Sequence, residues 1–364
     1  MKDITKSFHS GRAIFSLMLL ICCILAGAVI KIASSVILPF TIAVLLAFVM
    51  YPLIKTLDKI RFPRFLSIFI VVIIILIGLY IFGMVFYTSG RMIAAQYPKY
   101  EKRLTEIYMW LARLFELSYN EDLSFWENFW GQLGIRTFVR NFTFSFSNIF
   151  IKFISSAFLV VFFIVFILLE ASYFKEKLEI AFEKRSERIN KMGRDLMSQV
   201  NRYLTAKFLL SVANGLIFAV CFNLVGLEFA IVWGVIQFLL NFIPTLGSIV
   251  AGLIISLFAL IQFWPSPGPI IIVIAIILAV NMIGSVLDPK LIGEHVGISP
   301  LIVMVSLAIW GWIWGFAGMV LAVPMTVIIK IICENIPIME PVSIIVGSRK
   351  SILAKKAENE KAES

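Results

Sequence analysis

The feature that most constrains this chain is an uncharged apolar run that is too long for one membrane helix. Residues Phe229 to Gln262 carry no charge over 34 positions, whereas about 20 apolar residues suffice to cross the hydrocarbon core of a bilayer. Pro244, Thr245 and Gly247 interrupt this run. We therefore expect a membrane protein in which a helix ends or turns at Ile243–Gly247.

Composition agrees with this expectation and argues against several other classes of protein. The chain has 364 residues, of which 60% are hydrophobic and 15% charged, against about 25% charged in soluble domains. Its four cysteines lie in apolar runs without a CxxC pair, and it has only two histidines. We therefore expect no disulfide framework, metal site, cofactor or enzymatic activity. The net charge of +10 fits basic cytoplasmic loops better than nucleic acid as a partner.

Eight apolar segments are candidate membrane spans, and together they predict an all-α polytopic protein. They are residues 13–30, 32–54, 65–87, 150–169, 208–225, 229–262, 269–287 and 300–336. The first resembles a signal peptide, but a second apolar run follows directly, which favours a retained helix. The segments 229–262 and 300–336 are predicted to be broken or re-entrant. Basic loops indicate that both termini are cytoplasmic.

The regions between these spans are expected to differ in character. Residues 91–148 are predicted to form an external amphipathic, aromatic-rich region, which either lies at the lipid headgroups or packs as a cap on the bundle. The predicted organisation is helices 1–3 in 1–90, the external region 91–148, helix 4 in 149–171, a cytoplasmic amphipathic helix in 172–207, a membrane core with paired broken segments in 208–336, and a cytoplasmic tail in 337–364.

The two overlong segments correspond under a shift of 71 residues. This shift places Val225-Gly226 on Val296-Gly297, Pro244 on Gly315, and Gly247 on Gly318. Paired apolar segments interrupted by Gly or Pro indicate a transporter binding site. The reason is that backbone groups freed by a break need protein or water around them at membrane depth.

Polar residues in or near the spans are candidates for function. Asp288 ends the seventh span before Pro289, and a carboxylate there could bind a proton or a sodium ion, although Asp-Pro also commonly starts a turn. Glu228 follows Gly226 at a tight external turn and is expected to be structural. Four amides either bond between helices or line a polar path, and the sequence leaves both open: Asn214, Gln237, Asn241 and Asn281.

Four ordered motifs resemble those of the AI-2E family of bacterial membrane proteins. They are Ile243-Pro244-Thr245-Leu246-Gly247, Pro289 to Gly293, Gly297 to Leu301, and Gly315 to Pro324. The resemblance implies an eight-span inner-membrane protein that forms a homo-oligomer such as a pentamer. Members are described as exporters of autoinducer-2, as cation/proton antiporters or as sporulation membrane proteins. This chain departs from the family in having Asp288 where an asparagine is common.

These observations lead to one leading hypothesis and one alternative from another class. The first is a secondary transporter of a small polar solute similar to autoinducer-2, driven by a proton or sodium gradient, or a cation/proton antiporter. The second is a passive pore or a structural membrane protein that acts through 91–148. The expected partners are the lipid bilayer and a small polar solute or cation. The candidate pathway residues are Asn241, Pro244, Thr245, Gly247, Asp288, Pro289, Gly315, Gly318 and Pro324.

Overall fold

The protein is helical throughout the part of the chain that can be described. The computed structural model describes residues 24–114, 154–171, 186–288, 297–336 and 339–348, with single residues between 17 and 22 and between 173 and 180. Within these residues, the only extended pairing is an isolated bridge between Ile298 and Gly347. Seven helices there are long and apolar enough to cross a membrane. The prediction of an all-α polytopic membrane protein is thus confirmed.

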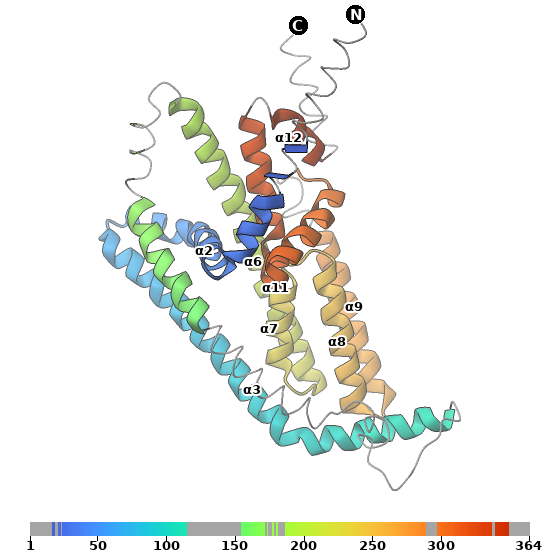
Figure 1. Cartoon of the computed structure of the whole chain (residues 1–364). Helices are drawn as coiled ribbons and strands as arrows, with labels where there is room; N and C mark the ends of the chain where they lie inside the picture. Colours follow the sequence, from blue (N-terminus) through green and yellow to red (C-terminus); the bar gives the residue numbers. More distant parts are fainter. Residues whose placement is uncertain are drawn as a thin grey trace, which may run out of the picture.

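The helices follow the order predicted from hydropathy, with different boundaries (Figure 1). They are α2 Ser34–Lys59, α3 Arg64–Leu114, a helix at Ile154–Ala171, α6 Ser186–Val225, α7 Ala230–Leu240, α8 Leu246–Phe263, α9 Pro267–Asp288, α11 Pro300–Asn335 and α12 Glu340–Val346. Part of the predicted first span, 13–30, lies outside the described residues. So do 115–148 of the external region, much of the predicted cytoplasmic helix 172–207 before Ser186, and most of the tail.

Helix α3 joins the third span to the predicted external helix without a break. It continues from the membrane-spanning portion Arg64–Met92 to Leu114, and Figure 1 shows it turning to run under one end of α7 and α8. We call residues 93–114 the arm. Apolar residues recur here at helical spacing (Tyr100, Leu104, Ile107, Leu111 and Leu114), as expected for the amphipathic part of 91–148, and the described part of that region is helical. Pro98 lies inside it and lacks the N–H that would complete the helical hydrogen-bond ladder.

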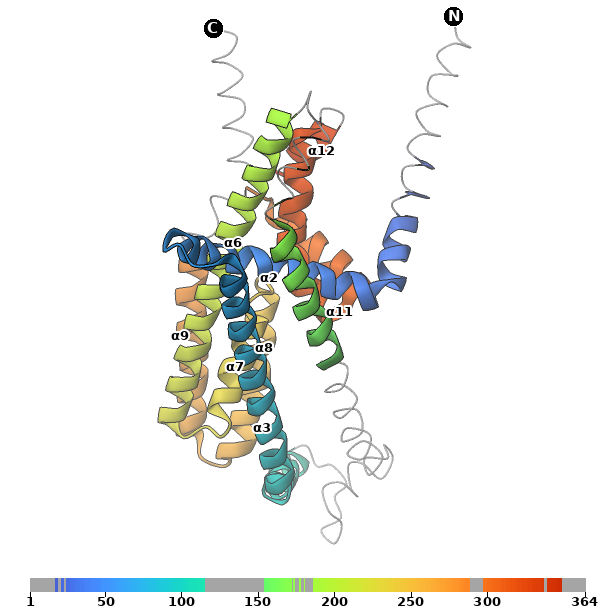
Figure 2. The ribbon, with the colours of Figure 1, turned by 90° about the vertical axis from the view of Figure 1, so that its left-hand side faces the viewer.

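Three buried clusters hold the described helices together. The first joins α2, α3 and Ile154–Ala171 through residues such as Ile68, Val71 and Ile164. The second joins α6 to α9, with Phe218, Phe222 and Ile255 fully buried. The third joins α2, α6 and α11. Figure 2 shows α2 crossing the direction of α3 and α6 rather than running beside them, which is how α2 reaches two of the three clusters.

Helices α6 and α7 pack with their backbones in close contact. A Cβ at Gly215 would lie 2.7 Å from the Gly234 carbonyl oxygen, and a Cβ at Gly234 would lie 2.5 Å from that of Gly215. Small residues permit this approach in membrane helix pairs, where apolar surface alone gives little drive for association. The contact fixes α7 against α6 midway along its length.

Candidate functional site: two hairpins that meet at α6

The uncharged run that begins at Phe229 folds as a helical hairpin. Helix α7 ends at Leu240, and α8 begins at Leu246. Between them the Ile243 N–H donates to the Leu240 carbonyl at 2.9 Å, and Thr245 has a positive φ of 58°. Gly247 is required at the tip, because a Cβ there would lie 1.8 Å from the Leu240 carbonyl oxygen. The predicted break at Ile243–Gly247 is present.

Both ends of the α7–α8 hairpin lie at the same end of the molecule. The Gln262 side chain, near the end of α8, accepts from the Glu228 N–H and donates to the Gly226 carbonyl, each at 2.8 Å. Helix α7 has 11 residues and therefore rises about 16 Å, roughly half of the hydrocarbon thickness. The segment 229–262 thus leaves and returns to the same end of the molecule, although α8 by itself is long enough to be a candidate span.

The other overlong segment, α11, contains a comparable hairpin. Gly315 has φ 60° and ψ −138°, which interrupts the helix. The Ser306 hydroxyl donates to the Ala322 carbonyl at 3.0 Å and also bonds the Thr326 hydroxyl, so the two halves lie side by side. A Cβ at Gly318 would lie 1.8 Å from the Trp310 carbonyl oxygen. Gly318 therefore plays the role at this tip that Gly247 plays at the other.

The two hairpins start at opposite ends, and their tips share one buried cluster with α6. In Figure 1 the α7–α8 hairpin starts at the end covered by the arm, and the α11 hairpin starts at the end occupied by α12. Ile243 of the first tip belongs to the same buried cluster as Trp310 and Trp314 of the second. Tyr203 and Leu204 of α6 belong to it as well. We call this meeting of the two tips with α6 the junction.

Polar side chains lie on α6 and α7 next to the junction. The Asn241 amide donates to the Ser211 hydroxyl at 3.0 Å, and both residues are buried. Gln237, one turn before Asn241, is 1% exposed, and its Oε1 has no hydrogen-bond partner within the described structure. An unmet buried acceptor costs about 1–3 kcal/mol. Within the described residues, Gln237 Oε1 is therefore an acceptor without a donor.

Comparison with known sequences identifies the family. The sequence matches the AI-2E family transporters over residues 15–338, which includes every helix from α2 to α11. The chain belongs to this family. It is therefore a multi-pass membrane protein from a family of transporters, and the resemblance carried by the four motifs is confirmed.

Several curated relatives extend over nearly the whole chain. A putative transport protein of Borreliella burgdorferi is 32% identical over 87% of this chain and 86% of its own length. The AI-2 transport protein TqsA of Escherichia coli is 28% identical over 90% and 93%. A sodium-lithium/proton antiporter of Halobacillus andaensis is 35% identical, over 44% of this chain and 45% of its own length.

The structure brings some of the predicted pathway residues together and leaves others apart. Asn241, Gly247, Gly318 and Pro324 are buried at or near the two tips, and Gly315 forms the second break. Thr245 is exposed, and its hydroxyl contacts the Pro244 carbonyl at 2.7 Å, so its hydroxyl belongs to the turn. Asp288 is the last residue of α9, with a side chain outside the described structure, as is all of Pro289. Their roles stay predictions.

Of the polar residues at the junction, Ser211 was missed from the sequence and Gln237 was left with two possible roles. Ser211 is the hydrogen-bond partner of Asn241, although 30 positions separate them. No local sequence pattern predicts that contact. Gln237 was one of four amides for which packing and pathway roles were equally open. Only the fold distinguishes it, by leaving its Oε1 unmatched. The three tryptophans of the α11 hairpin differ in burial. Trp310 and Trp314 are buried with ring centroids 5.0 Å apart, whereas Trp312 is 66% exposed.

Proposed function

We propose that this protein is a secondary transporter that moves a small polar solute, similar to autoinducer-2, across the bacterial inner membrane. The observation that carries the proposal is the junction, where two hairpins from opposite ends meet beside Gln237 and Asn241. Broken helices that meet within the membrane offer free helix ends and carbonyls to a solute. A site reached from both ends by separate hairpins can be opened to one side at a time.

The chemistry of the junction supports a solute rich in hydroxyl groups. Gln237 offers an unmatched acceptor, and the Asn241–Ser211 pair offers amide and hydroxyl groups that are already oriented. These groups carry no net charge, so they suit a neutral polar molecule that exchanges hydrogen bonds with them. The sequence contains no P-loop that would couple transport to ATP, which supports an ion gradient as the source of energy.

A second candidate function is exchange of sodium or lithium for protons. The observation in its favour is the 35% identity to the Halobacillus andaensis antiporter over 167 residues. Asp288, at the end of α9, is our candidate for the group that binds the coupling ion in either case. We further propose that both termini are cytoplasmic and that the protein acts as a homo-oligomer such as a pentamer.

Purified protein in liposomes distinguishes the two functions. One preparation is loaded with autoinducer-2 under an imposed proton or sodium gradient, and a second reports internal pH after lithium or sodium is added outside. Gradient-driven autoinducer-2 flux supports the first function, and cation-driven pH change without that flux supports the second. Ohmic currents that need no gradient of protons or sodium would contradict both and indicate a passive pore.

The coupling role of Asp288 is tested in the same liposomes. Asp288→Asn keeps the size of the side chain and removes its charge. We expect transport to lose its dependence on the ion gradient, so that solute equilibrates without accumulating. Equal gradient-driven accumulation by wild type and Asp288→Asn would exclude the coupling role and leave the pathway itself untouched.

A further inference from the structure

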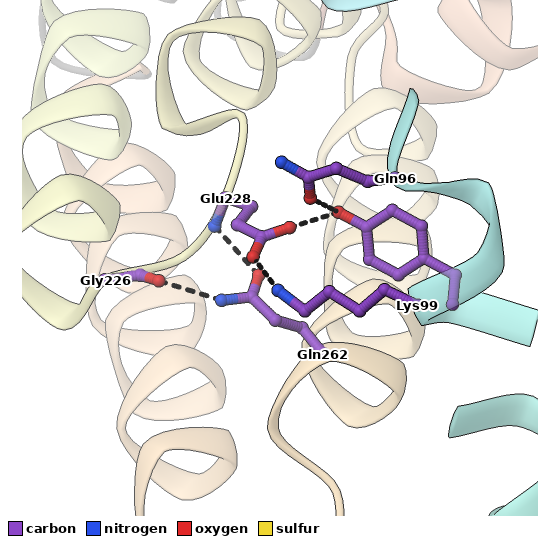
Figure 3. A network of polar contacts seen from close by, with 6 residues as sticks. Gln96, Lys99, Gly226, Glu228 and Gln262 are labelled. Carbon is purple, nitrogen blue, oxygen red and sulfur yellow. Dashed lines mark hydrogen bonds and ion pairs between the residues drawn. The ribbon is translucent and has the colours of Figure 1, made fainter. Parts of the chain in front are cut away.

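Glu228 links the arm of α3 to the turn between α6 and α7 through its carboxylate. It is the only charged residue between Phe208 and Leu287, and it lies in the turn between α6 and α7. Its carboxylate accepts from the Lys99 ammonium and the Tyr100 hydroxyl, both on the arm (Figure 3). The Gln96 side chain contacts the same Tyr100 hydroxyl at 3.1 Å. We call Glu228, Lys99 and Tyr100 the clasp.

The turn that carries Glu228 does not need the carboxylate for its own shape. The amide of Gln262 bonds the backbone on both sides of Leu227, at the Gly226 carbonyl and the Glu228 N–H. The Glu228 carbonyl accepts from the Trp233 indole at 3.1 Å. Figure 3 shows the two Gln262 bonds next to the contacts that the Glu228 carboxylate makes with the arm. The carboxylate is therefore free to serve the contact with the arm.

The membrane portion of α3 beyond its first turns has mostly exposed or half-buried side chains. Ile68 and Val71, near the start of α3, are buried in the cluster that α3 shares with α2. Among described side chains from 72 to 100, only Ser89 is buried. The arm meets the α6–α9 unit through the clasp and through rings: Tyr100 lies 5.6 Å from Phe258, and Trp110 lies 5.3 Å from Trp264. Most described side chains from 101 to 112 are half-buried and Ala112 is buried, whereas the Lys99 side chain, at the clasp, is half exposed.

Backbone strain is present at the same place. Phe229, which precedes α7, has a φ of 60°, a conformation that costs a residue with a side chain about 1–3 kcal/mol. Its ring packs 5.8 Å from Phe258 and 6.5 Å from Tyr100. Strained residues of this kind are frequent where two arrangements of a segment have to be close in energy.

We propose that the clasp opens and closes during transport, so that the arm alternately holds and releases the base of the α7–α8 hairpin. The path from clasp to junction is short and rigid. Trp233 ties Glu228 to α7, and Gln237 lies one turn further along the same helix. When the arm is docked, α7 and its polar residues are fixed relative to α3. When it is released, helices α6 to α9, which share one buried cluster, can shift together against α3.

Crosslinking across the clasp tests whether it has to open. The variant Lys99→Cys/Glu228→Cys, in a background without the four native cysteines, is treated with a thiol crosslinker that contains a reducible link. We expect autoinducer-2 flux in liposomes to fall by about tenfold or more and to return with reductant. The matched control is Arg103→Cys/Glu106→Cys, an ion pair within the arm itself, whose crosslinking should leave flux unchanged. Undiminished flux in the fully crosslinked clasp variant would overturn the proposal.

A distance measurement tests the clasp without any transported substrate. A negative result would therefore count against the clasp and not against the proposed transport function. Spin labels at Lys102→Cys on the arm and Leu224→Cys on α6 occupy exposed positions. We expect two distance populations in lipid. Glu228→Gln should raise the ratio of the longer-distance population to the shorter-distance population about tenfold. This matches the loss of one partly exposed charge-assisted hydrogen bond. Labels at Leu224→Cys and Leu253→Cys, within one unit, should give one unchanged distance. A single short population in both backgrounds would contradict an opening clasp.

Discussion

A methyl group at Gly247 has no room in the structure, and this gives a direct test of the hairpin tip. The Cβ of Gly247→Ala would lie 1.8 Å from the Leu240 carbonyl oxygen and 2.6 Å from its carbon. Both atoms belong to the backbone, so no side-chain rotation can relieve the contact. Ordinary contact begins at 3.4 Å, which means that the ends of α7 and α8 must separate by about 1.6 Å (3.4 minus 1.8).

The free-energy cost of this steric contact is opposed by the higher helix propensity of alanine relative to glycine. Overpacking costs about 1–3 kcal/mol and more where the backbone has to move, whereas alanine in place of glycine in a helix gains up to about 1 kcal/mol. We therefore expect Gly247→Ala to lower the stability by about 2 kcal/mol or more. For a protein of this size that corresponds to a fall of roughly 3 °C or more in the unfolding transition.

The assay is thermal unfolding of purified protein in detergent, compared at one heating rate because such transitions are often irreversible. The matched control is Gly78→Ala in α3, where a Cβ has no heavy atom within 4 Å, and whose transition should stay level or rise. Gly318→Ala should behave like Gly247→Ala, because its Cβ would also lie 1.8 Å from a carbonyl oxygen. Wild-type transitions for both tip variants would refute the two tight hairpins.

Three further predictions concern the break in α11, the α6–α7 contact and the clasp. Gly315→Ala should lower the free energy of unfolding by about 1–3 kcal/mol. The cause is the positive φ alone, because no atom lies close to a Cβ at that position. The measurement is the unfolding transition, which should move to a lower temperature. Gly234→Ala should separate α6 from α7, because its Cβ would lie 2.5 Å from a backbone oxygen, and it should lower the transition more than Gly252→Ala. Burial alone would raise the pKa of Glu228, but the bonds from Lys99 and Tyr100 outweigh it and hold the pKa below its usual range. The clasp should therefore stabilise the protein above about pH 4, and this contribution should be lost as the pH falls through the lowered pKa of Glu228. The measurement is the unfolding temperature as a function of pH. Glu228→Gln should lack the part of the acid-induced fall that is due to this contact.

The sequence predicted the positions of both breaks for a physical reason. Proline, threonine and glycine within an otherwise uninterrupted apolar run leave few alternatives to a turn, and the 71-residue shift pointed to Gly315 and Gly318 as the second break. The same reasoning located the helical arm from the spacing of its apolar residues. These features are local or periodic, so they can be seen without knowing which helices are neighbours.

The contacts that define the junction and the clasp were beyond that reasoning. Ser211 and Asn241 meet only because α6 and α7 pack at Gly215 and Gly234, and no residue pattern specifies that register. Glu228 stood out as the single charge in a long apolar stretch, which was a usable signal. Its partners, however, lie about 130 positions earlier on the arm of α3, and only the bend of that helix brings them together.

Transport by a pair of single variants tests the central claim, that solute passes the junction, most directly. Gln237→Leu removes the unmatched buried acceptor at the junction, and Ser67→Ala removes the other buried oxygen that has no partner within the described structure, in the separate cluster of α2 and α3. Both should keep or slightly raise the unfolding temperature, since each removes an unsatisfied polar group. Gradient-driven autoinducer-2 flux into liposomes should fall at least about tenfold, equivalent to 1.4 kcal/mol, in Gln237→Leu and stay at the wild-type level in Ser67→Ala. Equal flux in the two variants would contradict a pathway through the junction.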